Sequence, residues 1–80
     1  MPYITQKNRQ ELKMGKTITT PGELNYSISV MILEYLARKK KVDYGALNEV
    51  LGVLESVKLE YYRMAVAPYE DEKMGENGGL

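Results

Sequence analysis

The sequence predicts an all-α protein, an antiparallel hairpin of two long helices with a short helix at each end of the chain. Apolar residues recur every three to four positions through residues 24–36 and 47–64, as they do on one face of a helix. No stretch shows the apolar and polar alternation of a half-buried strand. A chain of 80 residues is long enough for one domain, so we expect residues 1–80 to fold as a single helical domain.

The first expected helix spans residues 5–14. Thr5 is a suitable N-cap, because its hydroxyl can accept a hydrogen bond from a free N–H of the first turn. Gly15 can end the helix, since glycine adopts the left-handed conformation that commonly follows a helix C-terminus.

The second expected helix spans residues 21–40 and has a clear start signal. Thr20 and Glu23 have the spacing of a capping box, in which Thr20 accepts from the N–H of Glu23 and the Glu23 carboxylate reaches back to Thr20. Pro21 suits the first helical position. The cations of residues 38–41 suit the negative C-terminal end of the helix dipole.

The third expected helix spans residues 44–66, with Asp43 as its N-cap. Gly45 and Gly52 lie inside it and predict a close neighbour, which is either a packed backbone or a ligand. Pro68 is expected to break or kink the helix, and Ala67 before it is biased away from α geometry. A short last helix at residues 68–74 and a flexible tail at residues 75–80 would follow.

Two features of the chain favour a hairpin that is completed by oligomerisation. The Val42-Asp43 connection between the two long helices is short, which favours an antiparallel arrangement. The chain has no cysteine and no histidine, so neither a disulfide nor a Cys/His zinc site can stabilise so small a domain. We therefore expect a homo-oligomer.

Composition also restricts the function. Without cysteine or histidine the common nucleophile and base combinations are missing, so we expect no enzyme, no catalytic residue, no metal and no cofactor. Eleven basic and eleven acidic residues give a net charge of zero, which argues against generic nucleic-acid binding. No apolar run is long enough to span a membrane, and residues 1–7 lack the apolar region of a signal peptide, so we expect a cytoplasmic protein.

Three groups of residues are candidates for binding, and one of them is the run of cations at residues 38–41, for which the alternative is a solvated helix end. Asn25 and Asn48 lie early in the two long helices beside the apolar face, where an amide can fix helix pairing or contact a ligand. The third group combines an arginine with tyrosines that can clamp an anion or stack on a base, and it contains Tyr61, Tyr62, Arg63 and Tyr69. The alternative for Arg63 is a surface ion pair with Glu60 or with the acidic residues 70–71.

Several strings in the chain resemble a family of short bacteriophage and bacterial proteins that carries a domain-of-unknown-function label. The resemblance covers nearly the whole chain and rests on Pro-Gly-Glu-Leu-Asn-Tyr at residues 21–26, Leu-Asn-Glu-Val-Leu-Gly at residues 47–52 and Ala-Pro-Tyr-Glu-Asp at residues 67–71. A second arginine often follows the first in this family, where this chain has Met64. The resemblance implies a compact helical fold and a phage or bacterial origin.

Three functional hypotheses follow. The first is a non-enzymatic, homo-oligomeric interaction protein that binds a macromolecule such as a host protein, because interfaces favour Tyr, Arg and Met. The second is a protein that sequesters a nucleotide-type small ligand in phage–host conflict, through Asn48, Tyr61, Tyr62 and Arg63. The third is a DNA-binding regulator that uses residues 38–41, which the zero net charge disfavours.

Overall fold

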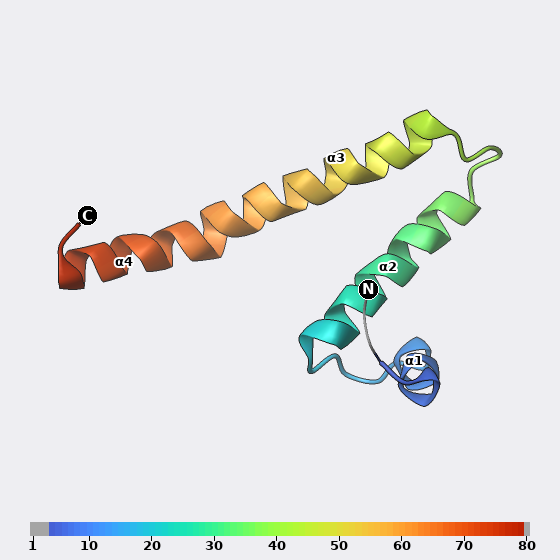
Figure 1. Cartoon of the computed structure of the whole chain (residues 1–80), viewed down its shortest axis with the longest axis horizontal. Helices are drawn as coiled ribbons and strands as arrows, with labels where there is room; N and C mark the ends of the chain where they lie inside the picture. The colour runs from blue at the N-terminus through green and yellow to red at the C-terminus, as the bar shows by residue number, and fades with distance from the viewer. Residues whose placement is uncertain (1–3, 80) are drawn as a thin grey trace. The chain divides into compact units, whose positions relative to one another are not determined.

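The computed structural model describes residues 4–79, and every regular element in this range is helical, as the all-α prediction requires (Figure 1). The chain divides into an N-terminal unit, Met1–Val42, and a C-terminal unit, Asp43–Leu80. Within residues 4–79, no helix combines the length and the apolar character needed to cross a lipid bilayer.

The N-terminal unit begins with helix α1, Gln6–Lys13. The hydroxyl of the N-cap Thr5 accepts a hydrogen bond from the N–H of Asn8 at 3.1 Å. Gly15 follows the helix with φ of +98°, and the N–H groups of Gly15 and Lys16 bond back to the carbonyls of Leu12 and Glu11. These two bonds form a Schellman motif, which explains why the helix ends where the glycine stands.

Helix α2, Pro21–Ala37, completes the N-terminal unit. It begins at Thr20, whose hydroxyl accepts from the N–H of Glu23 at 3.1 Å, with proline in the first turn as expected. It ends three residues before the predicted Lys40. The N–H groups of Arg38 and Lys39 bond to carbonyls three residues back, which tightens the last turn.

The connection between the long helices is therefore longer than predicted. Residues 38–43 form it, rather than Val42 and Asp43 alone.

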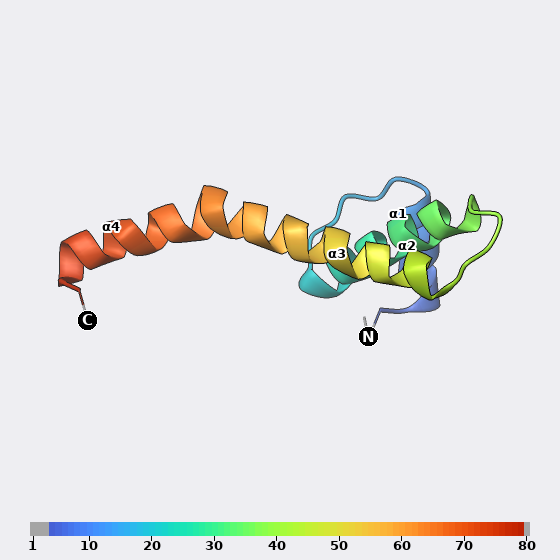
Figure 2. The ribbon, with the colours of Figure 1, turned by 90° about the horizontal axis from the view of Figure 1, so that it is seen from above.

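The C-terminal unit is one run of helix in three parts (Figure 2). Helix α3, Tyr44–Tyr61, starts at the predicted N-cap Asp43, whose carboxylate accepts from the N–H of Ala46 at 2.9 Å. A π-helical turn, η1, covers Tyr62–Val66, and helix α4 covers Ala67–Asn77.

The effect of Pro68 differs from the prediction. Ala67 keeps α geometry, with φ of −61° and ψ of −45°, and its N–H bonds to the carbonyl of Tyr62, five residues back. Proline lacks an N–H, and its ring crowds the carbonyl four residues before it. The wider π turn directly before Pro68 accommodates this strain, so the helix continues past the proline.

The last helix is also longer than predicted. Gly75, Glu76 and Asn77 belong to α4 rather than to a flexible tail. Lys73 and Glu76 form an ion pair at 3.2 Å that spans Gly75, and the helix stops at Gly78, where φ is +77°. Leu80, the end of the predicted tail, lies outside the described residues.

The described chain has almost no buried core of its own. Among residues 4–79, only Glu23 and Ala46 are buried, at 3% and 6% exposure. The close neighbours expected at the two α3 glycines are also missing from the described residues. A Cβ added to Gly52 would meet no atom within 4 Å, and one added to Gly45 would meet only the carboxylate of Asp43.

Candidate functional site

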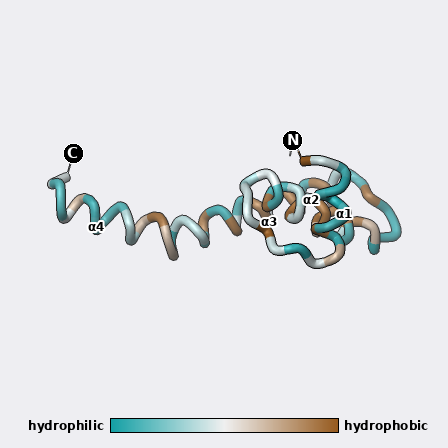
Figure 3. Tube along the Cα trace, turned by 90° about the horizontal axis from the view of Figure 1, so that it is seen from below, coloured by the Kyte–Doolittle hydropathy of each residue, from teal (hydrophilic) through white to brown (hydrophobic). Residues whose placement is uncertain are grey.

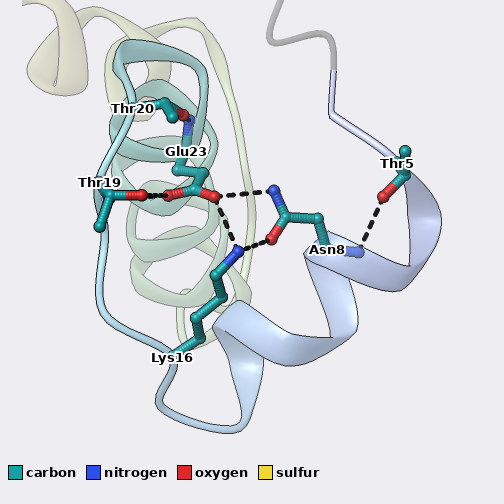
Figure 4. A network of polar contacts seen from close by, with 6 residues as sticks. All are labelled: Thr5, Asn8, Lys16, Thr19, Thr20 and Glu23. Carbon is teal, nitrogen blue, oxygen red and sulfur yellow. Dashed lines mark hydrogen bonds and ion pairs between the residues drawn. The ribbon is translucent and has the colours of Figure 1, made fainter.

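The best-ordered polar cluster of the N-terminal unit surrounds the Glu23 carboxylate (Figure 4). One oxygen, Oε1, accepts from the backbone N–H of Thr19 at 2.7 Å and from its hydroxyl at 3.1 Å. The other, Oε2, accepts from the Asn8 amide at 2.9 Å and from the Lys16 ammonium at 3.0 Å. Lys16 also donates to Asn8, at 2.6 Å. The carboxylate thereby ties α2 to α1 and to the connector between them.

These donors change the acidity of Glu23. The N–H of Thr19, the Asn8 amide and the Lys16 ammonium stabilise the charged form, and together they lower the pKa of Glu23 to about 2. Four donors on two oxygens leave little capacity for a ligand, so the cluster fixes the fold of the N-terminal unit rather than forming a binding site.

The capping-box prediction was right about Thr20 and wrong about the return bond. The Glu23 side chain accepts from Thr19, one residue before Thr20. The charge-assisted bonds from α1 and Lys16 draw the carboxylate toward the connector. Neither Asn8 nor Lys16 could be identified from the sequence, because both are separated from Glu23 in the chain and belong to no motif.

The long helix of the C-terminal unit carries an exposed apolar stripe with the spacing of a coiled-coil seam. We define the apolar stripe as Leu47, Val50, Leu54, Val57, Tyr61 and Met64. Val50 is half-buried, Leu54 is 37% exposed, and exposure reaches 75% at Met64. Figure 3 shows apolar positions recurring between polar ones along this helix. A single helix gains little stability from apolar side chains in water, so the stripe is a surface whose burial would stabilise the helix.

The π turn brings two residues of the last segment into contact. Tyr62 donates its hydroxyl hydrogen to the Glu70 carboxylate, eight residues later. In a regular α-helix a spacing of eight residues separates two side chains by about 80°. The additional residue of the π turn reduces this angle to about 20°, so that both side chains lie on one face. The Glu70 carboxylate also raises the pKa of Tyr62, because it binds the protonated hydroxyl and repels the phenolate.

We define the arm as η1 and α4, residues 62–77. An open hollow of about 530 Å³ lies along the arm, bordered by Tyr62, Tyr69, Glu70, Asp71 and Met74 among others. The Lys73 ammonium lies 5.6 Å from the centre of the Tyr69 ring. Exposed rings, methionines and carboxylates on one helix suit a partner that is both apolar and basic.

The structure distributes the predicted binding residues over both units. Tyr62 and Tyr69 border the same hollow. Asn48 is exposed on α3, whereas Asn25 is exposed on α2 of the N-terminal unit. Within its own unit, neither amide side chain forms a hydrogen bond with another described residue.

Tyr61 and Arg63 lie beside Tyr62 on the same helix, and both are exposed. Arg63 forms no ion pair with a described residue, and the expected pairs with Glu60 or residues 70–71 are not made. The Glu70 carboxylate binds Tyr62 instead.

The zero net charge conceals a strong separation between the units, which the overall composition did not reveal. Residues 1–42 contain eight basic and three acidic residues, whereas residues 43–80 contain three basic and eight acidic residues. The two units therefore carry formal charges of opposite sign and equal size. In the part of the chain that the structure describes, no three acidic residues are grouped to hold a metal ion.

No match was found among curated proteins or among solved structures. The full length of the chain, residues 1–80, matches a family described as "Domain of unknown function (DUF6899)". On this evidence, the protein belongs to the DUF6899 family.

Proposed function

We propose that this protein is a non-enzymatic interaction protein that buries its apolar stripe against a helical protein partner. The observation that carries this proposal is the exposure of the stripe, which reaches 75% at Met64 in a helix with coiled-coil spacing. Large apolar side chains in one continuous row usually mark a protein interface.

The predicted hairpin is part of this proposal but would not be sufficient. Helix α2 has 17 residues and is about 25 Å long, which matches the 18 residues and about 27 Å of α3. The arm adds about 24 Å of helix beyond α3. If α2 packed antiparallel along α3, the arm would still need another molecule to cover its apolar residues.

A nucleotide-type ligand receives less support. Arg63 is exposed and has no described ion-pair partner, which leaves it available to an anion. The arm, however, presents Glu70 and Asp71 at its hollow, and carboxylates repel phosphate. If Arg63→Ala abolished nucleotide binding by the protein while Lys58→Ala left it intact, this second candidate would replace the first.

Photo-crosslinking in cells tests the proposed function. A benzophenone amino acid replaces Met64, at the end of the stripe, and in a control protein it replaces Ser56, which is exposed off the stripe on the same helix. We expect a defined protein adduct from position 64 and far less from position 56. Equal adduct formation from both positions, or none from either, would contradict a stripe-mediated interaction.

A further inference from the structure

Building on the proposed function, we infer that the partner of the arm is a second copy of this chain, and that the arm docks on the N-terminal unit of that copy. The contact would be reciprocal, since each copy has one arm and one N-terminal unit. A reciprocal exchange closes into a two-fold dimer without leaving an arm uncovered.

Charge selects the N-terminal unit as the receiving surface. Residues 1–42 have five more cations than anions, and residues 43–80 have five more anions than cations. Pairing of two arms along their length would bring like charges together, which is unfavourable. Contact between an arm and an N-terminal unit would instead bring opposite charges together.

The N-terminal unit has a surface that fits such a helix. A hollow of about 370 Å³ lies between α1 and α2, with Leu12, Tyr26, Val30 and Met31 among its apolar borders. Apolar side chains of the arm, such as Tyr69 at 59% and Met74 at 53% exposure, are of the type that would fill it.

A basic rim borders this hollow. We define the basic rim as Arg9 and Lys13, which are one turn apart on α1. Lys13 borders the hollow directly, and the Arg9 guanidinium lies 5.7 Å from the centre of the Tyr26 ring. Neither cation forms an ion pair with another described residue, so both are available to carboxylates.

The arm supplies matching acids. Asp71 borders the hollow of the arm, and Glu72 follows it. Neither carboxylate forms an ion pair within residues 4–79. We therefore expect Asp71 and Glu72 of one copy to face the basic rim of the other.

Charge reversal with sedimentation equilibrium tests this assignment on the full chain. The arm variant carries Asp71→Lys and Glu72→Lys, and the rim variant carries Arg9→Glu and Lys13→Glu. We expect the parent protein to dimerise and each variant to dimerise roughly ten-fold more weakly. A control with Lys40→Glu and Lys41→Glu has the same charge change as the rim variant, and it should dimerise like the parent.

Mixing the two variants gives the sharper result. In a reciprocal dimer, one contact of the mixed pair joins a reversed arm to a reversed rim, and the other joins two unchanged surfaces. Both contacts are then complementary, so the mixture should form heterodimers with the affinity of the parent. A single chain carrying all four substitutions should also dimerise like the parent, which shows that the substitutions leave the fold intact.

Three results would overturn the inference. These are a parent protein that stays monomeric at every concentration, an arm variant that dimerises as well as the parent, and a mixture that does not recover affinity. A monomeric parent whose position 64 still crosslinks to a different protein would contradict the second copy as partner while leaving the proposed function in place.

Discussion

Glu23 is the residue on which the N-terminal unit depends most. It is buried and it accepts four hydrogen bonds. Their donors lie on α1 and on the connector between α1 and α2. The pKa of Glu23 is about 2, below its ordinary value of 4.5, so the unfolded state binds a proton more readily than the folded state. The stabilisation by this carboxylate is therefore complete above about pH 4.5 and is lost as the pH falls toward 2.

Glu23→Gln should remove this acid sensitivity. We expect the variant to unfold at a lower temperature than the parent at pH 7, because a neutral amide cannot accept the same charge-assisted bonds. Between pH 4.5 and 2 the thermal midpoint of the parent should fall while that of the variant changes less. Circular dichroism measures both, with Glu11→Gln, an exposed change on α1 of the same unit, as control. A variant as stable as the parent at pH 7 would show that the network contributes little.

Tyr62 reports on the contact across the π turn. Because the Glu70 carboxylate raises the pKa of Tyr62, this tyrosine should ionise at a higher pH than an ordinary tyrosine side chain. In ultraviolet titrations we expect Tyr62→Phe to remove the component of highest pKa, and Glu70→Gln to shift that component downward. Tyr61→Phe should leave it in place. The contact would be refuted by a highest component that survives in Tyr62→Phe.

At the scale of elements, the sequence was informative about helix starts and less informative about helix ends. Thr5, Thr20 and Asp43 all cap helices as predicted, because a cap depends on a few neighbouring residues. Helix α2 ends in a last turn that is tightened at Arg38 and Lys39, and α4 continues past Gly75 with an ion pair that spans it. Such balances of small terms are harder to predict from spacing alone.

The π turn is the element that local sequence rules missed. Proline predicts a break or a kink. Whether a π turn forms instead depends on how the backbone N–H and C=O groups on both sides of Pro68 find hydrogen-bond partners. The turn has a consequence for the arm, because it rotates every later side chain by about 100° relative to an uninterrupted α-helix.

Replacing Pro68 tests the origin of this turn. Pro68→Ala restores an N–H, so we expect residues 62–66 to return to regular α geometry and the helix content to rise. The same change should rotate Glu70 away from Tyr62, lowering the pKa of Tyr62 toward its ordinary value and weakening dimerisation. Ultraviolet titration and sedimentation check these effects. An unchanged pKa of Tyr62 would mean that the turn does not depend on the proline.

Gly52 offers a complementary test of what covers α3. No atom lies within 4 Å of a Cβ added there, so Gly52→Ala should stabilise the helix by about 1 kcal/mol. Denaturant unfolding measures this gain, and Ser56→Ala, one turn later on the same helix, is the control. A loss of stability or of association would indicate that a partner packs closely against Gly52. A packed backbone was one of the two neighbours predicted for this glycine, and a ligand was the other.

At the scale of the whole molecule, the helical class and membership of a family of unknown function could be predicted from the chain, and the charge separation could have been. The charge separation is visible once the sequence is divided between Val42 and Asp43, whereas the formal net charge of all residues together is zero. The binding residues are harder to assign, because Tyr62 and Tyr69 share a hollow only through the π turn. Asn25 and Asn48 are exposed and lie in different units, so the contacts within each unit assign them no role.

The central claim is that a second molecule orders the arm, and hydrogen exchange of the unmodified protein tests it most directly. We expect backbone amides of residues 62–77 to exchange slowly at high protein concentration and markedly faster after roughly hundred-fold dilution, because dissociation exposes the arm. Amides of α2 serve as the internal comparison. Protection of the arm that stays constant in a monomer, or rapid exchange of the arm at every concentration, would contradict the claim.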